Sequence, residues 1–425
     1  MTPTPATVGE TLGDRVHGVE TFLVDGGPAK SWVWVRLQST EGVVGWGECY
    51  TAPGREPAIR ALADELGRSL AGREVGAIRH FTSVAYRDFA TKRGSLELSC
   101  AVSGLEQAMW DVLGKTLGRP VHALLGGPCR ERFRVYANGW SYGASGDTAD
   151  VVGAVAAAQE LVAAGWNALK FDPFHGPWRP YVGRDEVRAA VECVAAVREA
   201  VGPDVDLLVE VHRRLAPPAA RRLAGELEPF DPFWLEEPVD CRNVEALRDL
   251  AAHTTIPIVT GETLYSRAEF LPVLERRAAG IVNPDVASCG GILELTQIAA
   301  MADAHLVAVA PHNYNSTALG LAATIQAAAV MPNFLIAEYF VNFAARSREL
   351  VEVPLVPVDG YLDLPTAPGL GIVVDEAALR SLPGPAPRCW EAADGGLVDV
   401  DPEAGRRREV DVPLDGLERQ IDELA

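Results

Sequence analysis

The sequence predicts an α/β protein in which a parallel β/α barrel follows a smaller α+β domain. In residues 131–345, eight short apolar runs alternate with amphipathic helical patterns, which fits a modified TIM-type barrel better than an open sheet. Residues 1–130 begin instead with an antiparallel pattern that is followed by helices. Residues 346–425 lose both rhythms and are rich in Pro, Gly and acidic residues. We therefore expect an N-terminal capping domain that is completed by C-terminal residues packing back on it.

The N-terminal domain is predicted first from alternation and then from helical spacing. Between Gly18 and Tyr50, the β-like runs VETFLV, SWVWVRL and VVGWGECY are separated by turn residues, which indicates an antiparallel meander. Apolar residues at three- and four-residue spacing then predict helices at Pro57–Ala71, Val75–Ala90 and Leu96–Leu117.

The barrel strands are predicted from apolar runs separated by helical patterns. The runs are FRVYA, NALKFD, VDLLVEVH, FWLEEP, IPIVTGE, IVNPD, VAVAPH and FLIAEYF. Helices are expected between them, for example at Asp150–Ala164, Asp185–Val201, Ala216–Leu227 and Ile292–Ala304. Because the reactive groups of such barrels lie at the C-terminal ends of the strands, the residues that end these runs are the candidates for function.

Composition excludes several classes of protein. The 425 residues are 48% hydrophobic and 23% charged, which is typical of a globular protein. A formal net charge of −20 disfavours nucleic acid and anionic membranes as partners. Seven cysteines without a C-x-x-C pair indicate a reducing compartment. The N-terminus shows no signal-peptide pattern, and polar residues interrupt the uncharged stretch Asn313–Ala337, so we expect a cytoplasmic protein without a transmembrane segment.

Three glutamates at strand ends predict a metal site. Glu210, Glu236 and Glu262 are 26 residues apart, about one β/α unit, so three successive strands would bring one carboxylate each to the same mouth. Converging carboxylates need a cation, and ligands that are all oxygen favour Mg²⁺ over Zn²⁺. Taken singly, Glu236 could lie in a solvated junction and Glu262 could cap the following helix. The matched spacing favours the metal site.

Two histidines also end predicted strands. Asp285 and His312 close two further strands and could meet across the mouth, which would make His312 a general base near neutral pH. His212 lies two residues beyond Glu210, so period-two alternation keeps both side chains on the inner side of the barrel. The alternative for each histidine is a structural hydrogen bond. The arginines that follow His212 in the run EVHRR are expected to be solvated.

Lys170 is one of only four lysines, against 34 arginines, and it lies within an apolar strand. An ammonium that lines the barrel near a metal could hold a substrate carboxylate, whereas the alternative is an ion pair with Asp172 or Glu210. We also expect Asp172, Asn138 and Trp140 to contact the substrate.

Several motifs between Val16 and Gly371 occur together: WGE (46–48), DVLGKTLGRPVHALLGG (111–127), WLEEP (234–238), GE (261–262), NPD (283–285), GGI (290–292) and APH (310–312). In combination they resemble the enolase superfamily, mandelate racemase subgroup, and within it the galactonate dehydratase-like acid-sugar dehydratases. The resemblance implies a capping domain over a modified barrel, Mg²⁺ on the three glutamates, and Asp285 with His312 as the base.

The resemblance also implies a role for three further residues. Glu338 matches the acid on the eighth strand, Lys170 the first lysine of the second-strand motif, and His212 the histidine that accompanies the base in galactonate dehydratase-like members. The sequence departs from the family pattern in two places. The first metal ligand is Glu rather than the more usual Asp, and Asp172 stands where racemases of this subgroup carry a second, catalytic lysine.

The expected reaction is Mg²⁺-dependent elimination of water from an aldonate-like acid sugar, a small carboxylate. The C2 proton would go to His312, Mg²⁺ and Lys170 would stabilise the enediolate, and the 3-hydroxyl would leave with help from His212 to give a 2-keto-3-deoxy acid. Capping-domain loops at residues 25–30 and 49–55 would select the sugar, and we expect a homo-oligomer. The alternatives are an epimerase, racemase or cycloisomerase that uses the same enediolate, or a non-catalytic sensor.

A serine hydrolase is a further alternative. Residues 139–143 match the G-x-S-x-G motif around Ser141, and Asp285 followed by His312 has the chain order of an α/β-hydrolase triad. Against this alternative, the nucleophile elbow must enter a helix at once, whereas Ala-Ser-Gly-Asp-Thr intervenes, and the three glutamates are left without a role. The sequence contains no G-x-G-x-x-G or P-loop motif, so a nucleotide site has no support.

Overall fold

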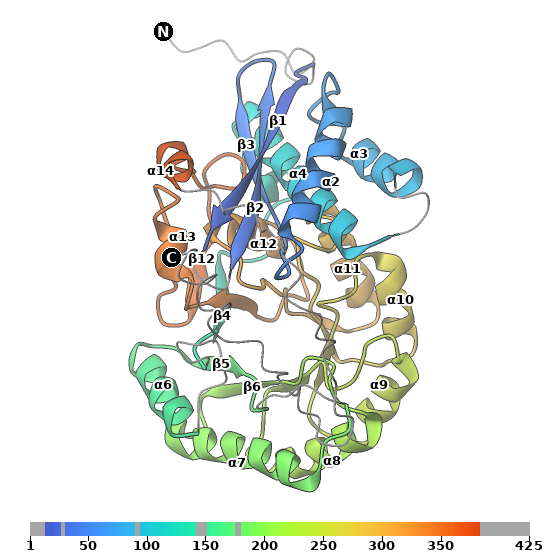
Figure 1. Ribbon diagram of the computed structural model, residues 1–425, viewed down its shortest axis with the longest axis vertical. Helices are drawn as coiled ribbons and strands as arrows, with labels where there is room; N and C mark the ends of the chain where they lie inside the picture. The colour runs from blue at the N-terminus through green and yellow to red at the C-terminus, as the bar shows by residue number, and fades with distance from the viewer. Residues whose placement is uncertain (1–12, 27–29, 90–93, 142–150, 175–179, 383–425) are drawn as a thin grey trace, which may run out of the picture.

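Figure 1 shows two parts, a small antiparallel sheet with its helices, coloured blue to cyan, and a larger parallel barrel. This computed structural model describes residues 13–26, 30–89, 94–141, 151–174 and 180–382. The predicted α/β class and the order of the two parts are confirmed.

The N-terminal sheet is the predicted meander. Its strands are β1 (Val16–Asp25), β2 (Ser31–Ser39) and β3 (Val44–Cys49), paired antiparallel in the order β1-β2-β3. Helix α2 (Glu56–Leu70) packs on β1, and helix α4 (Leu96–Thr116) packs on β2 and β3. The approach of α4 to β3 requires Gly47, because a Cβ there would lie 2.0 Å from the carbonyl oxygen of Gly104.

The second predicted helix is shorter than expected. Helix α3 spans Ile78–Val84 and is followed by a π-helical turn, η1 (Ala85–Phe89), whereas the prediction was Val75–Ala90. The helix begins later because the Val75 amide donates to the carbonyl of Asp14 and therefore belongs to an extended segment. Ala90 lies outside the described residues.

The barrel consists of eight parallel strands in the described part of the chain, and each predicted run overlaps one of them. They are β4 (Arg132–Asn138), β5 (Ala168–Phe171), β6 (Asp206–Glu210), β7 (Trp234–Glu236), β8 (Ile258–Thr260), β9 (Ile281–Val282), β10 (Ala308–Val309) and β11 (Ala337–Phe340). The strand order is β10-β9-β8-β7-β6-β5-β4-β11. The ring closes where the Leu335 amide donates to the carbonyl of Val309 at 2.8 Å.

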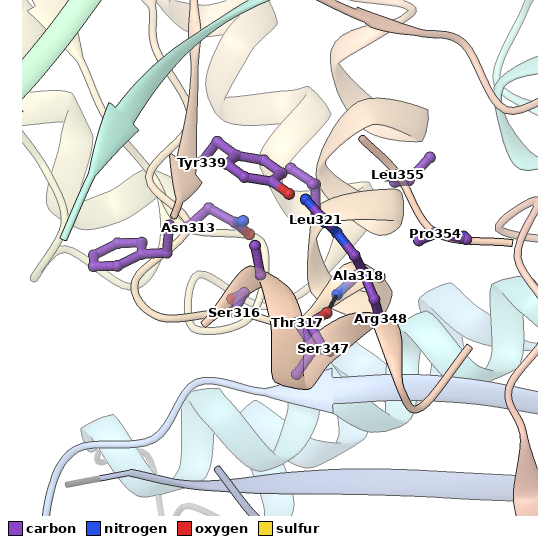
Figure 2. A pocket seen from close by; sticks show the side chains of 12 residues that line it. Asn313, Ser316, Thr317, Ala318, Leu321, Tyr339, Ser347, Arg348, Pro354 and Leu355 are labelled. Carbon is purple, nitrogen blue, oxygen red and sulfur yellow. Dashed lines mark hydrogen bonds between the residues drawn. The ribbon is translucent and has the colours of Figure 1, made fainter. Parts of the chain in front are cut away.

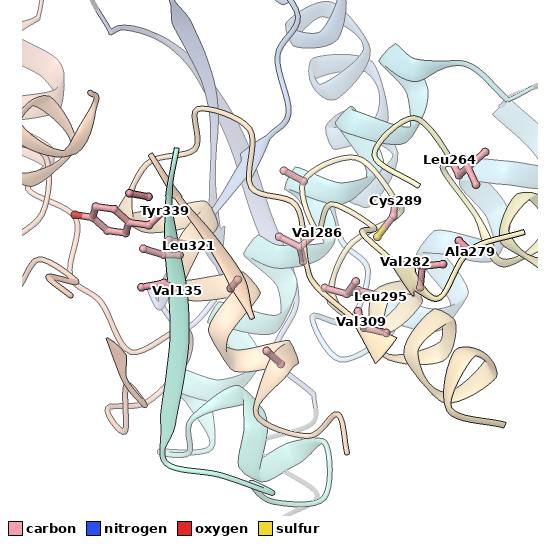
Figure 3. Close-up of a cluster of buried hydrophobic side chains, with 14 of the residues drawn as sticks. Val135, Leu264, Ala279, Val282, Val286, Cys289, Leu295, Val309, Leu321 and Tyr339 are labelled. Carbon is pink, nitrogen blue, oxygen red and sulfur yellow. The ribbon is translucent and has the colours of Figure 1, made fainter. Parts of the chain in front are cut away.

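One helix follows each strand of the barrel. These are α6 (Val151–Ala163), α7 (Arg184–Val201), α8 (Pro217–Leu227), α9 (Val244–Ala251), α10 (Arg267–Glu275), α11 (Ile292–Ala304), α12 (Ala318–Ala328) and α13 (Ala344–Arg348). The short helix α5 (Val121–Leu124) precedes β4, and the 3₁₀ turn η2 (Glu228–Phe230) follows α8. Figure 3 shows apolar side chains from strands, such as Val135 and Val309, in the same cluster as Leu295 and Leu321 from helices. This layer holds the helices against the strands.

The described C-terminal residues contact both parts. Strand β12 (Tyr361–Asp363) pairs antiparallel with β4 of the barrel. Helix α14 (Glu376–Ser381) faces the N-terminal sheet, where Arg380 pairs with Glu20 at 2.8 Å and Glu376 pairs with Arg36 at 3.2 Å. The domain boundaries at residues 130 and 345 stay a prediction, and residues 383–425 lie outside the described residues.

Two buried glutamates of the N-terminal part fix it over the barrel. The Glu48 carboxylate accepts from the amides of Thr317 and Gly320 at the start of α12, and from the Thr317 hydroxyl. The Glu106 carboxylate accepts from the amides of Ile292, at 2.7 Å, and Leu293, at 2.9 Å, at the start of α11. Each acid therefore caps a barrel helix at the end where its dipole attracts negative charge.

Within the described ranges, no helix combines the length and apolar character that crossing a bilayer would require. The stretch 313–337 instead contains α12 and leads into β11. The cysteines that the structure describes are all free.

Candidate active site

A ring of polar side chains lies at the C-terminal ends of the strands, directly above an apolar layer. Inside the barrel, each strand or its flank contributes one apolar residue to a single cluster: Tyr136, Ala168, Leu208, Trp234, Val259, Ile281, Ala310 and Ile336. Two residues further along, the same face carries Asn138, Lys170, Glu210, Glu236, Gly261, Asn283, His312 and Glu338. Because the strands are pleated, residues two positions apart face the same way, and the polar site therefore lies directly above the apolar layer.

Glu262 is the exception to this register, because the inward position on β8 is taken by Gly261. Gly261 has a positive φ of 137°, and a Cβ there would lie 2.5 Å from the Phe270 ring. The resulting turn brings Glu262 into the mouth from one residue later. Glu262 therefore does not cap α10, whose N-cap residue is Ser266.

The three predicted metal ligands converge. One carboxylate oxygen from each of Glu210, Glu236 and Glu262 lies within 4.8 Å of the others, and all three residues are buried. The Oε2 atom of Glu236 has no hydrogen-bond partner among the described residues, and the Oε2 atom of Glu210 has only the Lys170 ammonium, at 3.3 Å. Buried carboxylate oxygens with so few donors, arranged as an all-oxygen set, fit a hard divalent cation. The residues present therefore fit a bound metal ion.

Lys170 lies at the centre of this charge cluster. Its Nζ is 2.7 Å from Glu236 Oε1, 3.0 Å from Glu338 Oε1 and 3.3 Å from Glu210 Oε2. The ion pair with Glu210 that the sequence allowed is present, but Asp172 is paired elsewhere. Burial alone would lower the pKa of Lys170, but Glu236 and Glu338 outweigh it and hold this pKa well above its usual range. Lys170 is therefore a permanent cation.

The carboxylates in the cluster differ in their affinity for protons. Burial and the neighbouring Glu210 raise the pKa of Glu236 well above its ordinary value, although Lys170 opposes this. Burial also favours the neutral form of Glu262, but Arg213 and His312 hold the pKa of Glu262 well below its ordinary value.

His312 meets Asp285 as expected. Its Nδ1 is 2.9 Å from Asp285 Oδ2, and its Nε2 is 3.0 Å from Glu262 Oε2 and 3.6 Å from Glu338 Oε2. Burial would lower the pKa of His312, but Glu338 and Glu262 raise it well above its usual range. The imidazole therefore has an orienting carboxylate on one nitrogen and faces the glutamate cluster with the other.

His212 is held by a second carboxylate. Its Nδ1 is 2.7 Å from Asp172 Oδ2, and the guanidinium of Arg214 also contacts that oxygen. Burial lowers the pKa of His212, but Glu210 and Asp172 outweigh it, so the net shift is upward. Asp172, expected to contact the substrate, is thus paired with protein groups.

The expectation that the two arginines after His212 are solvated is wrong. Arg214 is only 7% exposed and pairs with Asp172, and the Arg213 guanidinium contacts Glu262. The reason lies in the backbone, since His212 and Arg213 have positive φ angles of 53° and 63°. The chain turns back over the mouth instead of continuing outward into solvent.

Asn138, the last residue of β4, faces the same mouth, and Trp140 and Ser141 follow it. Asn138 donates from Nδ2 to Glu338 Oε1 at 2.7 Å, and the buried indole Nε1 of Trp140 has no partner among the described residues. Ser141 is buried, and neither ring nitrogen of His312 contacts it, since both are directed to carboxylates. A hydrolase triad is therefore not formed, and residues 142–143 of the motif lie outside the described residues.

A small cavity lies beside the charge cluster. Its volume is about 310 Å³ including the part that opens to solvent, and Figure 2 shows Tyr339, Asn313 and Leu321 among its lining side chains. None of the converging glutamates lines it, and neither does His212 or His312. The cavity is therefore adjacent to the charged mouth and separate from it.

Two asparagines of the site were not identified from the sequence. The side-chain Nδ2 of Asn283 donates to Glu236 Oε1 at 2.9 Å, and the backbone N–H of Asn313 donates to Glu338 Oε2 at 2.8 Å. Asn283 could have been found, because it occupies the inward position of β9 two residues before Asp285. The contact of Asn313 is made by its backbone, for which the sequence contains no signal.

Comparison with known families agrees with this geometry. Residues 153–378 match the family described as enolase C-terminal domain-like, and residues 25–126 match the mandelate racemase / muconate lactonizing enzyme N-terminal domain. A mandelate racemase/muconate lactonizing enzyme from Sulfitobacter superposes with a TM-score of 0.80 at 34% identity, covering 88% of this chain and 97% of that one. The chain belongs to the enolase superfamily, mandelate racemase subgroup.

Several curated relatives within this superfamily are named for the reaction that they catalyse. A D-galactonate dehydratase of Variovorax paradoxus (strain S110) is 36% identical over 405 residues, covering 91% of this chain and all of the relative. A D-gluconate dehydratase of Thermoproteus tenax is 36% identical over 351 residues, covering 82% of this chain and 69% of the relative. These curated relatives are dehydratases, that is, hydro-lyases.

Proposed function

We propose that this enzyme dehydrates an aldonate-like acid sugar with Mg²⁺ as its cofactor. The observation that carries the proposal is the placement of two carboxylate-oriented imidazoles. His212 follows β6 and His312 follows β10, four strands apart in a ring of eight, so the two imidazoles flank the mouth from opposite sides. Dehydration needs two proton transfers, one at C2 and one at the departing 3-hydroxyl, and two such groups are available. The names of the curated relatives support an acid sugar as substrate.

Glu210, Glu236 and Glu262 would hold the metal ion. Their all-oxygen donor set supports Mg²⁺ over Zn²⁺, and Glu236 Oε2 has no hydrogen-bond donor among the described residues. Bound there, Mg²⁺ would stabilise negative charge that develops on the substrate carboxylate. The ammonium of Lys170 would act on the same charge, because it lies among these carboxylates and stays protonated.

His312 would take the C2 proton. Asp285 on Nδ1 leaves Nε2 as the basic atom and stabilises the imidazolium that forms. The C2–H electron pair moves into the enediolate and then forms the C2–C3 double bond as the C3–O bond breaks. The raised pKa of His312 depends partly on Glu262. Neutralising Glu262 with a cation would lower this pKa towards the range of a base.

His212 would protonate the leaving hydroxyl, which departs as water. Asp172 and Arg214 hold the imidazole in place, and its raised pKa keeps a proton ready for transfer. The enol product then tautomerises to a 2-keto-3-deoxy acid. Glu338 would complete the site by holding Lys170 and Asn138.

The histidine roles are tested by C2–H exchange in deuterated water, followed by NMR, with Mg²⁺ and D-galactonate, D-gluconate and related acids. The wild type should form 2-keto acid. His212→Asn should still abstract the C2 proton, with exchange into unreacted substrate, whereas His312→Asn should lose both exchange and product. Exchange that survives in His312→Asn and vanishes in His212→Asn would reverse the assignment. Substrate returned with inverted configuration at C2 would replace dehydratase with epimerase.

We also infer a cytoplasmic location, supported by the free cysteines of the described chain, and assembly into a homo-oligomer. Light scattering of the purified protein tests the second inference, since a mass equal to one chain would contradict it.

A further inference from the structure

Glu237 contacts the turn that carries one of the metal-ligand candidates. It directly follows Glu236, the last residue of β7, and its side chain is 0% exposed. Its Oε1 accepts a hydrogen bond from the Gly261 amide at 2.8 Å and a second one from the Thr260 hydroxyl at 2.9 Å. A carboxylate that follows one strand therefore holds the backbone at the end of the next strand, one residue before Glu262.

Glu237 also holds the turn that carries Arg213. The backbone of Glu237 has a positive φ of 44°, and its carbonyl accepts from the Arg213 amide at 2.6 Å. The Arg213 guanidinium contacts Glu262, and its Nη1 lies 4.0 Å from Glu237 Oε2. Glu237 therefore lies between the two turns that bring Glu262 and its guanidinium partner together at the mouth.

Glu262 depends on its turn for its place in the mouth. It lies two residues beyond β8, whereas Glu210 and Glu236 are the last residues of their strands. The backbone between β8 and Glu262 turns at Gly261, where φ is 137°. A shift of this turn would move the Glu262 carboxylate and leave the other two carboxylates in place. The geometry of the metal site therefore depends on the turn that Glu237 holds.

We propose that Glu237 is a positioning residue that sets the affinity of the metal site by holding Glu262 in place, without binding the metal ion itself. This inference rests on the metal site of the proposed function. The converging oxygens among the described residues come from Glu210, Glu236 and Glu262, and Glu237 does not belong to that group. Groups that orient a metal ligand typically contribute about 10- to 100-fold to metal affinity.

The test uses two variants that separate the reach of the side chain from its charge. Glu237→Gln keeps the length and an acceptor oxygen but loses the charge. Glu237→Asp keeps the charge but is one methylene shorter, so it cannot reach the Gly261 amide from the same backbone position. The Mg²⁺ dissociation constant is measured by calorimetry on the folded proteins. Glu237→Asp should bind Mg²⁺ about 10- to 100-fold more weakly than wild type, and Glu237→Gln should lose less than about tenfold.

Glu106→Asp is the matched control. Glu106 is equally buried, and its carboxylate also accepts two hydrogen bonds, from the amides of Ile292 and Leu293, but these amides begin a helix that carries none of the three glutamates. This variant should lose stability and keep the wild-type Mg²⁺ affinity. A merely structural role of Glu237 would give the same result in Glu237→Asp, which would overturn the proposal.

Two other outcomes would also overturn it. Weaker Mg²⁺ binding in Glu237→Gln than in Glu237→Asp would make the charge, and not the hydrogen bond, the important property. A loss in Glu237→Gln as large as that in Glu236→Gln would make Glu237 a ligand. If Glu237→Asp fails to fold, Glu237→Gln alone decides, because only the positioning role predicts that it retains most of the affinity.

Hydrogen exchange in chelator examines the turn without the metal ion. Mass spectrometry of a peptide that covers residues 258–264 should show faster amide exchange in Glu237→Asp than in wild type, and exchange close to wild type in Glu237→Gln. Equal exchange in all three proteins would contradict the proposal. If the wild type binds no Mg²⁺, the metal site of the proposed function fails instead, and this measurement then decides whether Glu237 holds the turn.

Discussion

Replacing Lys170 with methionine should destabilise the metal-free protein and increase its response to Mg²⁺. The ammonium is 2% exposed and lies 2.7 to 3.3 Å from three buried carboxylates. Removing one partner of a buried ion pair costs about 3–5 kcal/mol, because the remaining charge is left uncompensated. Glu236 already has a raised pKa and can take up a proton, which limits the cost. We therefore expect the unfolding free energy of the metal-free protein to fall by about 3 kcal/mol at neutral pH.

The assay is urea unfolding in chelator and then with Mg²⁺. A divalent cation replaces the missing positive charge, so Mg²⁺ should raise the unfolding midpoint of Lys170→Met more than that of the wild type. Activity should nevertheless fall about 100-fold or more, since the ammonium would act on transition-state charge.

Lys115→Met is the matched control for this prediction. Lys115 pairs with the buried Asp111 at 2.6 Å but is itself 25% exposed, and Asp111 keeps the amide donors of Trp46 and Leu370. The loss of Lys115 should therefore cost only about 1–2 kcal/mol and leave the Mg²⁺ response unchanged. Equal stability of the two variants in chelator, or the same Mg²⁺ response in Lys170→Met and wild type, would refute the reasoning. An unchanged kcat would reduce Lys170 to a structural ion pair.

Three further predictions concern the metal ligands, the proposed base and a buried glutamate of the N-terminal part. Replacement of any one metal-ligand candidate by glutamine should weaken Mg²⁺ binding in calorimetry and abolish activity, and full activity in strong chelator would contradict the metal site. Asp285→Asn should lower kcat by about 10²- to 10⁴-fold, measured at substrate saturation, because His312 loses its orienting carboxylate; an unchanged rate would remove Asp285 from the mechanism. Burial raises the pKa of Glu106 to about 7 in spite of the amides that donate to it, so the folded protein holds a proton that the unfolded chain releases near 4.5. The contribution of this proton to the unfolding free energy is fully present below about pH 4.5 and is lost as the pH rises through about 7. The unfolding free energy of wild type relative to Glu106→Gln should therefore fall between about pH 5 and about pH 7.5.

Strand ends were the part of the site that could be predicted. Lys170, Glu210 and Glu236 were identified because a barrel strand alternates with period two and its last inward residue faces the mouth. Asp285 and His312 were identified in the same way. These positions depend on local pattern and on the closure of one ring of strands, and both can be read along the chain.

The arginines and the loops could not be predicted in this way. Arg214 was expected in solvent, but positive φ angles at two preceding residues turn it back onto Asp172, 42 residues earlier in the chain. Alternation indicates where a strand points and carries no information about a turn of this kind.

Local periodicity alone determined the barrel, the meander and the convergence of Glu210 and Glu236, because strand pleat and β/α spacing are properties of short segments. Glu262 joins them only through the turn at Gly261, which has a positive φ. The pairing of each histidine with one particular carboxylate, and the hydrogen bond from the Gly261 amide to Glu237, were decided only by the tertiary structure. These contacts join residues on different strands and loops, and the energy of a buried charge depends on all the neighbours that folding brings around it.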